Sequence, residues 1–481
     1  MSLVPPTFFL LAQSAAERLA AAREGLDIPM SQRLVGVLGI ATMLGIAVLL
    51  SADRKKIDWR LVGAGVGLQA LFGVLVLKTE IGRQVFARVG EMITALLGFQ
   101  EQGARFVFGN LVQSSVPVTS ADGSAIEGAA QVAQTGAYFA FNVLPTIIFF
   151  SALMSVLYYL GVMQLIVKSL AFVMQKTLKT SGPETLSASG NIFLGQTEAP
   201  LLIKPFVGTM SRSELNTVMV GGFATVAGGV LAAYVGMLSG WFPGIAAHLL
   251  AASVMNAPAG LAISKILMPE TDEGRAHAAS LREAESAMKA AEPVPPRKRI
   301  FQIGGHSGES GMIEAAANGA AQGVQLAINV AAMLMAFVAL VALINAILGW
   351  GGALVGIDGL SLQSILGTLL RPLAWVMGVP WQDTPYVGSL IGLKATLNEF
   401  VAYAQFGADL GAGQVLEPRS AIILTYALLG FANFSSIAIQ IGGIGGLAPE
   451  RRGEIAQLGL KAMIGGNLAA FTSACLAGML V

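Results

Sequence analysis

The sequence predicts an all-α polytopic membrane protein with eight transmembrane helices, two re-entrant helical hairpins in inverted repeats, and one interfacial amphipathic helix. Three observations carry this prediction. Hydrophobic residues make up 54% of the 481 residues, whereas charged residues make up only 12%, well below the roughly 25% of soluble domains. Long apolar runs recur along the chain. Two segments with polar centres interrupt this pattern at related positions.

The apolar runs define the predicted spans. A helix needs roughly 20 residues to cross about 30 Å of hydrocarbon at 1.5 Å per residue. Eight runs meet this requirement, at residues 33–51, 61–78, 136–160, 215–238, 243–268, 319–349, 418–442 and 455–480. Residues 81–99 differ, because Arg83, Arg88 and Glu91 interrupt their apolar residues with a helical period, which is typical of an interfacial helix. Residues 1–30 are interpreted as an uncleaved amphipathic lead-in.

Basic residues in the loops predict the orientation, because short loops rich in Lys and Arg stay in the cytoplasm. Such residues separate the first two spans, follow the third and precede the eighth, and six more lie in the 269–311 connection. The turn at 239–243 carries no charge. This pattern places both termini outside and the 269–311 connection in the cytoplasm. A bacterial inner membrane is the expected location of the chain.

Composition and motifs exclude other classes of protein. A net charge of +1 does not suit a nucleic-acid-binding protein, and the single Cys475 cannot form an intramolecular disulfide or a cysteine metal cluster. The spans contain no His-Glu-x-x-His, paired Asp motif or Gly-x-Ser-x-Gly, so we do not expect an enzyme. No cofactor is expected.

Residues 183–206 and 384–407 are apolar at both ends and polar in the middle. Each carries a central carboxylate, Glu198 or Glu399, that is costly at the bilayer midplane, and Gly and Pro residues that break helical hydrogen bonding. Each half of about 10 residues would reach only halfway through the hydrocarbon. We therefore predict two re-entrant hairpins whose tips meet near the midplane.

Each hairpin is followed by a span with a similar polar motif. Gly222-Phe223-Ala224-Thr225 follows the first hairpin, and Gly430-Phe431-Ala432-Asn433 follows the second. The predicted orientation puts the ends of the two hairpins on opposite sides, so the two copies are inverted. Inverted repeats with discontinuous helices are typical of secondary transporters, in which helix ends offer dipoles and free carbonyl groups to substrate and ion.

Several longer motifs are similar to those of the concentrative nucleoside transporter family. They are Gly195-Gln196-Thr197-Glu198-Ala199-Pro200, Asn398-Glu399-Phe400-Val401-Ala402-Tyr403 and Gly430-Phe431-Ala432-Asn433-Phe434-Ser435-Ser436-Ile437. The likeness runs from about residue 30 to the C-terminus. It implies sodium-coupled nucleoside symport by a homotrimer in the lipid bilayer, with an elevator-type alternating-access mechanism.

The resemblance also implies a division of the chain into scaffold and transport domain. The expected units are 1–180 (N-terminal spans, interfacial helix and scaffold span three), 181–268 (first hairpin repeat), 269–318 (cytoplasmic loop), 319–350 (scaffold span six), 351–442 (second hairpin repeat) and 443–481 (C-terminal span). The two hairpin repeats would form the transport domain.

The same resemblance assigns the site residues. Gln196, Thr197 and Glu198 would bind the nucleobase, while Glu399, Asn433 and Ser436 would hold the ribose hydroxyls. An ionised carboxylate suits this task, because it accepts charge-assisted hydrogen bonds from a diol. A sodium ion would lie between the first hairpin tip and a break in the fourth span. Its ligands would be the side chains of Asn191 and Thr225 and the carbonyl groups of Leu194 and Val226.

One alternative function is another two-hairpin elevator carrier, for dicarboxylates or amino acids. Such anionic substrates would call for an Arg or a Ser-rich helix tip rather than two glutamates. Lys394, in the second hairpin, could pair with a carboxylate or extend outward along its half-helix, and a structural role is favoured.

Overall fold

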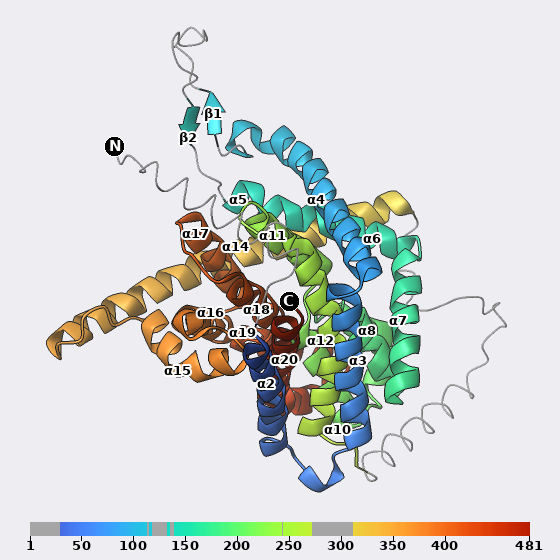
Figure 1. Ribbon diagram of the computed structural model, residues 1–481. Helices are drawn as coiled ribbons and strands as arrows, with labels where there is room; N and C mark the ends of the chain where they lie inside the picture. Colours follow the sequence, from blue (N-terminus) through green and yellow to red (C-terminus); the bar gives the residue numbers. More distant parts are fainter. Residues whose placement is uncertain (1–28, 113–114, 118–131, 135–138, 243, 272–310) are drawn as a thin grey trace.

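The computed structural model describes residues 29–112, 115–117, 132–134, 139–242, 244–271 and 311–481 (Figure 1). Most of the predicted lead-in at 1–30 and of the 269–311 connection lies outside these residues. The described chain is helical apart from β1 (Ser115–Pro117) and β2 (Val132–Gln134), which form a short antiparallel pair. The prediction of a helical polytopic protein is thus confirmed, with this ribbon as the exception.

The N-terminal elements match the sequence pattern closely. They are α2 (Met30–Leu49), η2 (Arg54–Lys56), α3 (Trp59–Leu77), α4 (Glu80–Phe108) and η3 (Gly109–Val112). The side chain of Asp58 caps α3 by accepting hydrogen bonds from two backbone N–H groups of its first turn. Arg83, Arg88 and Glu91 are exposed on α4, as expected for an amphipathic helix, although α4 extends beyond the predicted 81–99.

The longest helix of the described residues packs against a shorter one. After α5 (Phe139–Asn142), helix α6 (Leu144–Tyr159) runs along α14 (Met312–Leu354). A Cβ atom at Gly319 would lie 2.6 Å from the Cβ atom of Ser155, and one at Gly323 would lie 2.7 Å from the Cα atom of Ile148. Glycine therefore allows the backbones to approach, as in other helix pairs in lipid. Helix α14 is longer than the span predicted at 319–349.

The first repeat contains two interrupted elements. Its helices are α8 (Gly182–Gly190), η4 (Ala199–Ile203), α9 (Lys204–Val207), α10 (Arg212–Ala224), α11 (Gly228–Leu238) and α12 (Ile245–Leu267). The second arm of the first hairpin is a 3-10 helix followed by one short helical turn, because Pro200 and Pro205 lack the N–H groups that a regular helix needs. The predicted span 215–238 is broken at Thr225–Ala227, between α10 and α11.

The second repeat contains the matching break. Its elements are α15 (Leu362–Val376), η5 (Trp381–Asp383), α16 (Thr384–Thr396), α17 (Glu399–Gly411), α18 (Pro418–Leu428) and α19 (Phe434–Leu447), and η6 (Pro449–Arg451) and α20 (Arg452–Leu480) follow. Gly430 lies in the break between α18 and α19 with φ +109°. A Cβ atom there would lie 2.6 Å from the carbonyl oxygen of Phe223, so the two breaks pack directly against each other.

Seven spans in the described residues are long and apolar enough to cross a membrane, and one of them, Arg212–Leu238, includes the break between α10 and α11. The predicted span 418–442 is divided into α18 and α19, which are each shorter, so the predicted count of eight is not confirmed. Two helices were not predicted, namely α7 (Val162–Leu178) and α15. Both are amphipathic, since Lys168 and Arg371 interrupt their apolar residues.

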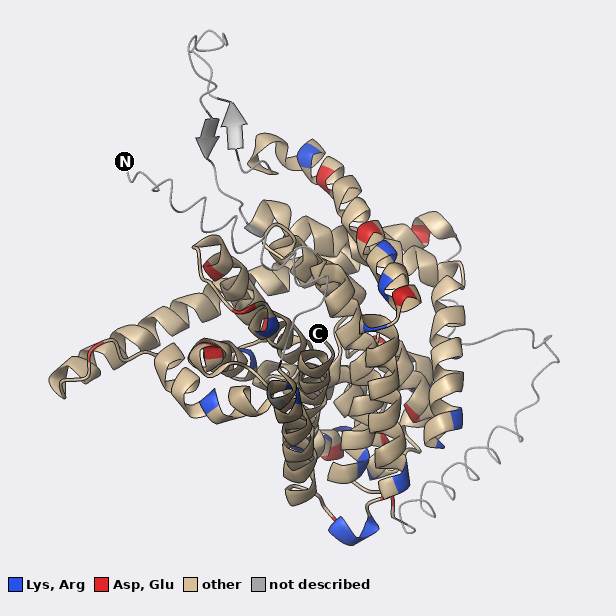
Figure 2. Ribbon diagram, viewed as in Figure 1, with Lys and Arg blue, Asp and Glu red and all other residues tan. Residues whose placement is uncertain are grey.

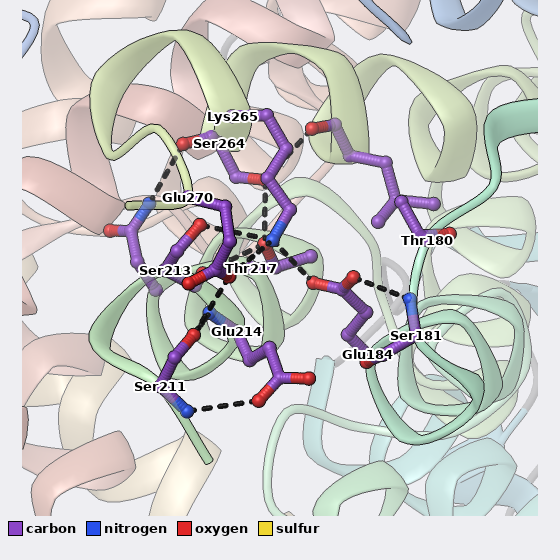
Figure 3. Close-up of polar contacts among 12 residues, drawn as sticks. Thr180, Ser181, Glu184, Ser211, Ser213, Glu214, Thr217, Ser264, Lys265 and Glu270 are labelled. Atoms are coloured by element: carbon purple, nitrogen blue, oxygen red, sulfur yellow. Dashed lines mark hydrogen bonds and ion pairs between the residues drawn. The ribbon is translucent and has the colours of Figure 1, made fainter. Parts of the chain in front are cut away.

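Charged side chains form a network where the first hairpin begins. Lys and Arg colour η2 and neighbouring helix ends at the bottom of the view in Figure 2. Lys265 lies in the last turn of α12, with its Nζ atom 2.6 Å from Glu184 of α8, 3.7 Å from Glu270 and 3.0 Å from the Oγ atom of Ser213 (Figure 3). Glu184 also accepts a hydrogen bond from the N–H group of Ser181. The network thus links α8, α10 and α12.

Candidate functional site

A cavity of about 460 Å³ lies where the two hairpin tips meet the break of the second repeat. The six residues predicted to bind substrate all line it: Gln196, Thr197, Glu198, Glu399, Asn433 and Ser436. Apolar residues of α14 form another wall, including Leu326, Val330 and Met333. This volume falls in the range of about 300–1,000 Å³ that is typical of small-molecule sites. An apolar wall opposite convergent polar groups is also typical of such sites.

Glu399 is the central carboxylate of this cavity and is only 3% exposed. Its Oε1 atom accepts a hydrogen bond from the hydroxyl group of Tyr234 at 3.1 Å, and its Oε2 atom accepts one from the amide of Asn433 at 2.8 Å. The residue is the first of α17, which Asn398 caps by accepting a hydrogen bond from the N–H group of Val401. The helix dipole therefore favours the negative charge at this end.

Asn433 connects this carboxylate to the start of α19. Its Oδ1 atom accepts hydrogen bonds from the N–H group of Ser436 at 2.9 Å and from the Oγ atom of Ser435 at 2.7 Å. Both ends of its amide thus have partners, and the orientation of the amide is set by the helix that it caps. The arrangement fixes Glu399 in one rotational position while leaving lone pairs on the carboxylate for a further donor.

The first hairpin tip contacts the second repeat directly. The Nε2 atom of Gln196 donates to the Oγ atom of Ser436 at 3.2 Å, and its Oε1 atom accepts from Gln440 at 3.1 Å. Gln440 also donates to the carbonyl group of Met219 in α10. Thr197 is half-buried, and Glu198 is exposed. Hydrogen-bonding groups from both repeats therefore face the same space.

The residues predicted to bind the ion lie between the first hairpin tip and the break after α10. Asn191 is fully buried, and neither polar atom of its side chain has a hydrogen-bond partner. A Cβ atom at Gly221 would lie 3.2 Å from its Nδ2 atom, so the side chain lies against the end of α10. The hydroxyl group of Thr225 donates to the carbonyl group of Gly221 at 2.9 Å. A buried amide without partners at such a position requires a partner that is not part of the chain, such as a water molecule or an ion.

The backbone around this point leaves two carbonyl groups free. The N–H group of Gly228 donates to the carbonyl group of Phe193 at 2.9 Å and so joins the break to the hairpin tip. No donor among the described residues reaches the carbonyl groups of Leu194 or Val226. With Asn191 and Thr225, these two carbonyl groups give a set of neutral oxygen atoms, which suits a hard cation.

Lys394 does not extend outward. It is fully buried, and its Nζ atom donates to the carbonyl groups of Ala427 at 2.9 Å and Leu429 at 3.1 Å. These carbonyl groups lie where α18 ends and lack partners within the helix. The lysine therefore satisfies carbonyl groups of the second break, an arrangement that was not among the two predicted for it.

The sequence reasoning missed several polar residues of the site, among them Tyr234, Gln440 and Asn329. Asn329 lines the cavity from α14, and the other two orient Glu399 and Gln196. The ring of Tyr234 stacks on Tyr403 with centroids 4.3 Å apart. The available signal was a polar group within an apolar helix, since a buried hydroxyl or amide needs a partner.

Three family models match the chain and together cover most of it. The model described as "Na+ dependent nucleoside transporter C-terminus" matches residues 248–478, and its N-terminal counterpart matches residues 38–111. A model described as "Nucleoside recognition" matches residues 140–241.

Similar proteins occur in bacteria and mammals. An uncharacterised transporter of Haemophilus influenzae is 41% identical, over 93% of this chain and 98% of its own length. One of Bacillus subtilis is 42% identical, over 93% and 99%. Sodium/nucleoside cotransporter 1 of Rattus norvegicus is 41% identical over 93% of this chain, which spans 64% of the rat protein.

Solved structures show the same fold. The transporter CNTnw in an inward-facing substrate-bound state has a TM-score of 0.78 and 42% identity, over 93% of this chain and 97% of its own. A variant of CNTnw in an outward-facing state has a TM-score of 0.79 and 41% identity, over 94% and 98%. The matched models, relatives and structures agree with one another, and the chain therefore belongs to the family of sodium-dependent, concentrative nucleoside transporters.

Proposed function

We infer that the chain imports nucleosides together with sodium ions, by alternating access of the cavity between the hairpin tips. The convergence of six hydrogen-bonding residues on one cavity is the observation that carries this inference. Glu399 can accept hydrogen bonds from the ribose hydroxyls, with Asn433 and Ser436 beside it. Gln196, Thr197 and Glu198 supply both donors and acceptors to a nucleobase edge.

Sodium binds, on this proposal, at Asn191 and Thr225 and at the carbonyl groups of Leu194 and Val226. The unpartnered side chain of Asn191 supports this assignment, because a fully buried amide without partners costs free energy that an ion would recover. None of these ligands titrates near neutral pH, so the set favours sodium coupling over proton coupling.

The movement is of the elevator type, with the hairpin repeats as the mobile part. We propose that residues 183–242 and 384–442 move as one body against α6 and α14, in a homotrimer in the bacterial inner membrane. The close packing of α6 on α14 supports a rigid scaffold, and the contact of Gly430 with Phe223 supports a single mobile body. A crosslink between α14 and the first hairpin is expected to abolish transport, and unimpaired transport by the crosslinked protein would contradict the movement.

Uptake of labelled uridine into proteoliposomes tests the whole proposal. Uptake is expected to exceed equilibrium when sodium is higher outside, and to fall to simple equilibration without a sodium gradient. Accumulation driven by a pH gradient in sodium-free vesicles would overturn sodium coupling. Uptake of dicarboxylates or amino acids in place of uridine would favour the alternative carrier.

A further inference from the structure

Helix α12 donates side-chain hydrogen bonds to both discontinuities that frame the proposed ion site. The hydroxyl group of Ser253 donates to the carbonyl group of Ile192, in the first hairpin tip, at 2.8 Å. The amide of Asn256 donates to the carbonyl group of Ala224, at the end of α10, at 2.7 Å. Both side chains are fully buried. Because they are three residues apart, they lie on the same face of α12.

Each of the two carbonyl groups that accept these hydrogen bonds lies two residues before a carbonyl group proposed to bind sodium. Ile192 lies two residues before Leu194, and Ala224 lies two residues before Val226. In both places the bound carbonyl group precedes one that no donor among the described residues reaches. Holding the first carbonyl group limits the directions in which the second can point, because only two soft torsions per residue separate them.

Close packing between α12 and α10 keeps these side chains within hydrogen-bonding distance of the break. A Cβ atom at Gly260 would lie 3.6 Å from the Cβ atom of Ala224 and 3.7 Å from Val220, so α12 is in contact with α10 near the break. The Oδ1 atom of Asn256 is buried and has no partner, so the amide is held by its donor end alone.

We propose that Ser253 and Asn256 are positioning residues of the ion site, which set the affinity and the selectivity for sodium by fixing the carbonyl groups of the two breaks. This proposal rests on the proposed function. Neither residue needs to touch the ion. Selectivity among small cations depends on the number and the positions of the coordinating oxygen atoms, and a looser carbonyl pair would bind sodium more weakly and discriminate less against lithium.

Asn216 offers a matched control for Asn256. It is also fully buried, and its amide donates to the carbonyl group of Ser264 at 3.2 Å. Both asparagines thus join α10 and α12 by a side-chain hydrogen bond to a carbonyl group. Of the two asparagines only Asn256 acts at the break, because the acceptor of the Asn216 bond is Ser264, the residue before Lys265 in α12.

The test compares the full-length variants S253A, N256A and N216A in proteoliposomes. The sodium concentration for half-maximal uridine uptake is expected to rise about tenfold in N256A and about threefold or more in S253A, and less than twofold in N216A. The ratio of sodium to lithium effectiveness should fall in S253A and N256A alone. The KM for uridine at saturating sodium should change less than twofold.

Thermal unfolding in the presence of sodium gives a second measurement, which does not require the variant to transport. Sodium raises the unfolding temperature of the purified protein if it binds the native state, and the rise should require more sodium in N256A and S253A than in N216A. Equal sodium dependence in all three variants would overturn the proposal while leaving the proposed function intact. Sodium-independent uptake by the unaltered protein would overturn both.

Discussion

The hydrogen bond from Tyr234 to Glu399 allows a test of whether this tyrosine helps the carboxylate to bind a ribose. Tyr234→Phe removes the hydroxyl group that lies 3.1 Å from Oε1, while Asn433 still donates to Oε2. Hydrogen bonds to charged groups contribute about 1.5–3 kcal/mol. Glu399→Gln should therefore raise the Kd for uridine about 10- to 150-fold, since each 1.4 kcal/mol is tenfold. Tyr234→Phe removes a partner of the carboxylate rather than the carboxylate itself, and should raise the Kd for uridine about three- to tenfold.

The assay is equilibrium binding of labelled uridine to purified protein at saturating sodium. Tyr403→Phe is a matched control, because Tyr403 stacks on Tyr234 but donates its hydroxyl group to the carbonyl group of Thr425 at 2.7 Å. Its effect on the Kd should be less than twofold. Binding of 2′,3′-dideoxyuridine should be nearly insensitive to all three substitutions, because this ligand lacks the hydroxyl groups from which Glu399 would accept hydrogen bonds.

A double-mutant cycle decides whether the tyrosine acts through the carboxylate. In the Glu399→Gln background, Tyr234→Phe should have little further effect, because the charge that the hydroxyl group supports is gone. Additive losses would refute this reasoning. Equal losses for uridine and its dideoxy analogue would show that Glu399 supports the fold rather than binding the sugar.

Three further predictions concern other buried polar groups. Asn191→Leu or Thr225→Val should raise the sodium concentration for half-maximal uptake at least tenfold, and should weaken nucleoside binding only at limiting sodium, which a sodium titration of uptake would show. Lys394→Met should destabilise the protein by about 2–4 kcal/mol, because two carbonyl groups at the end of α18 lose their donor, and thermal unfolding measures this loss. Removing either Lys265 or Glu184 alone should cost about 3–5 kcal/mol, whereas replacing both by apolar residues should restore most of the stability.

Part of the fold can be predicted from the sequence, because lipid strongly disfavours charged side chains and unpaired backbone groups. Glu198 and Glu399 indicated the two hairpins, because a carboxylate within an apolar membrane segment is energetically costly and is usually functional. The lone amide Gln440 and the phenol Tyr234 gave weaker signals, because both fit within an apolar helix until their partners are known. Those partners come from elements distant in the chain, at Gln196 and Glu399.

Other features were missed because their local sequence patterns differ from those of a simple membrane span or a regular half-helix. Helices α7 and α15 are amphipathic and have too few consecutive apolar residues to be recognised as spans. The second arm of the first hairpin is irregular where Pro200 and Pro205 interrupt it, although its apolar composition resembles a half-helix. The domain division, the ion ligands and the substrate contacts remain predictions, and the experiments above address them.

The placement of the proposed ion site suggests how sodium and nucleoside binding would be coupled. Asn191 and Gln196 belong to the same turn of chain between α8 and η4, so an ion that fixes Asn191 and the carbonyl group of Leu194 would also restrict Gln196. Gln196 reaches across to Ser436 of the second repeat, beside the hydrogen-bonded amide of Asn433 and carboxylate of Glu399. A nucleoside would then bind to a tip that is already ordered, and would lose less conformational entropy in doing so. By linkage, the nucleoside would strengthen sodium binding by the same factor.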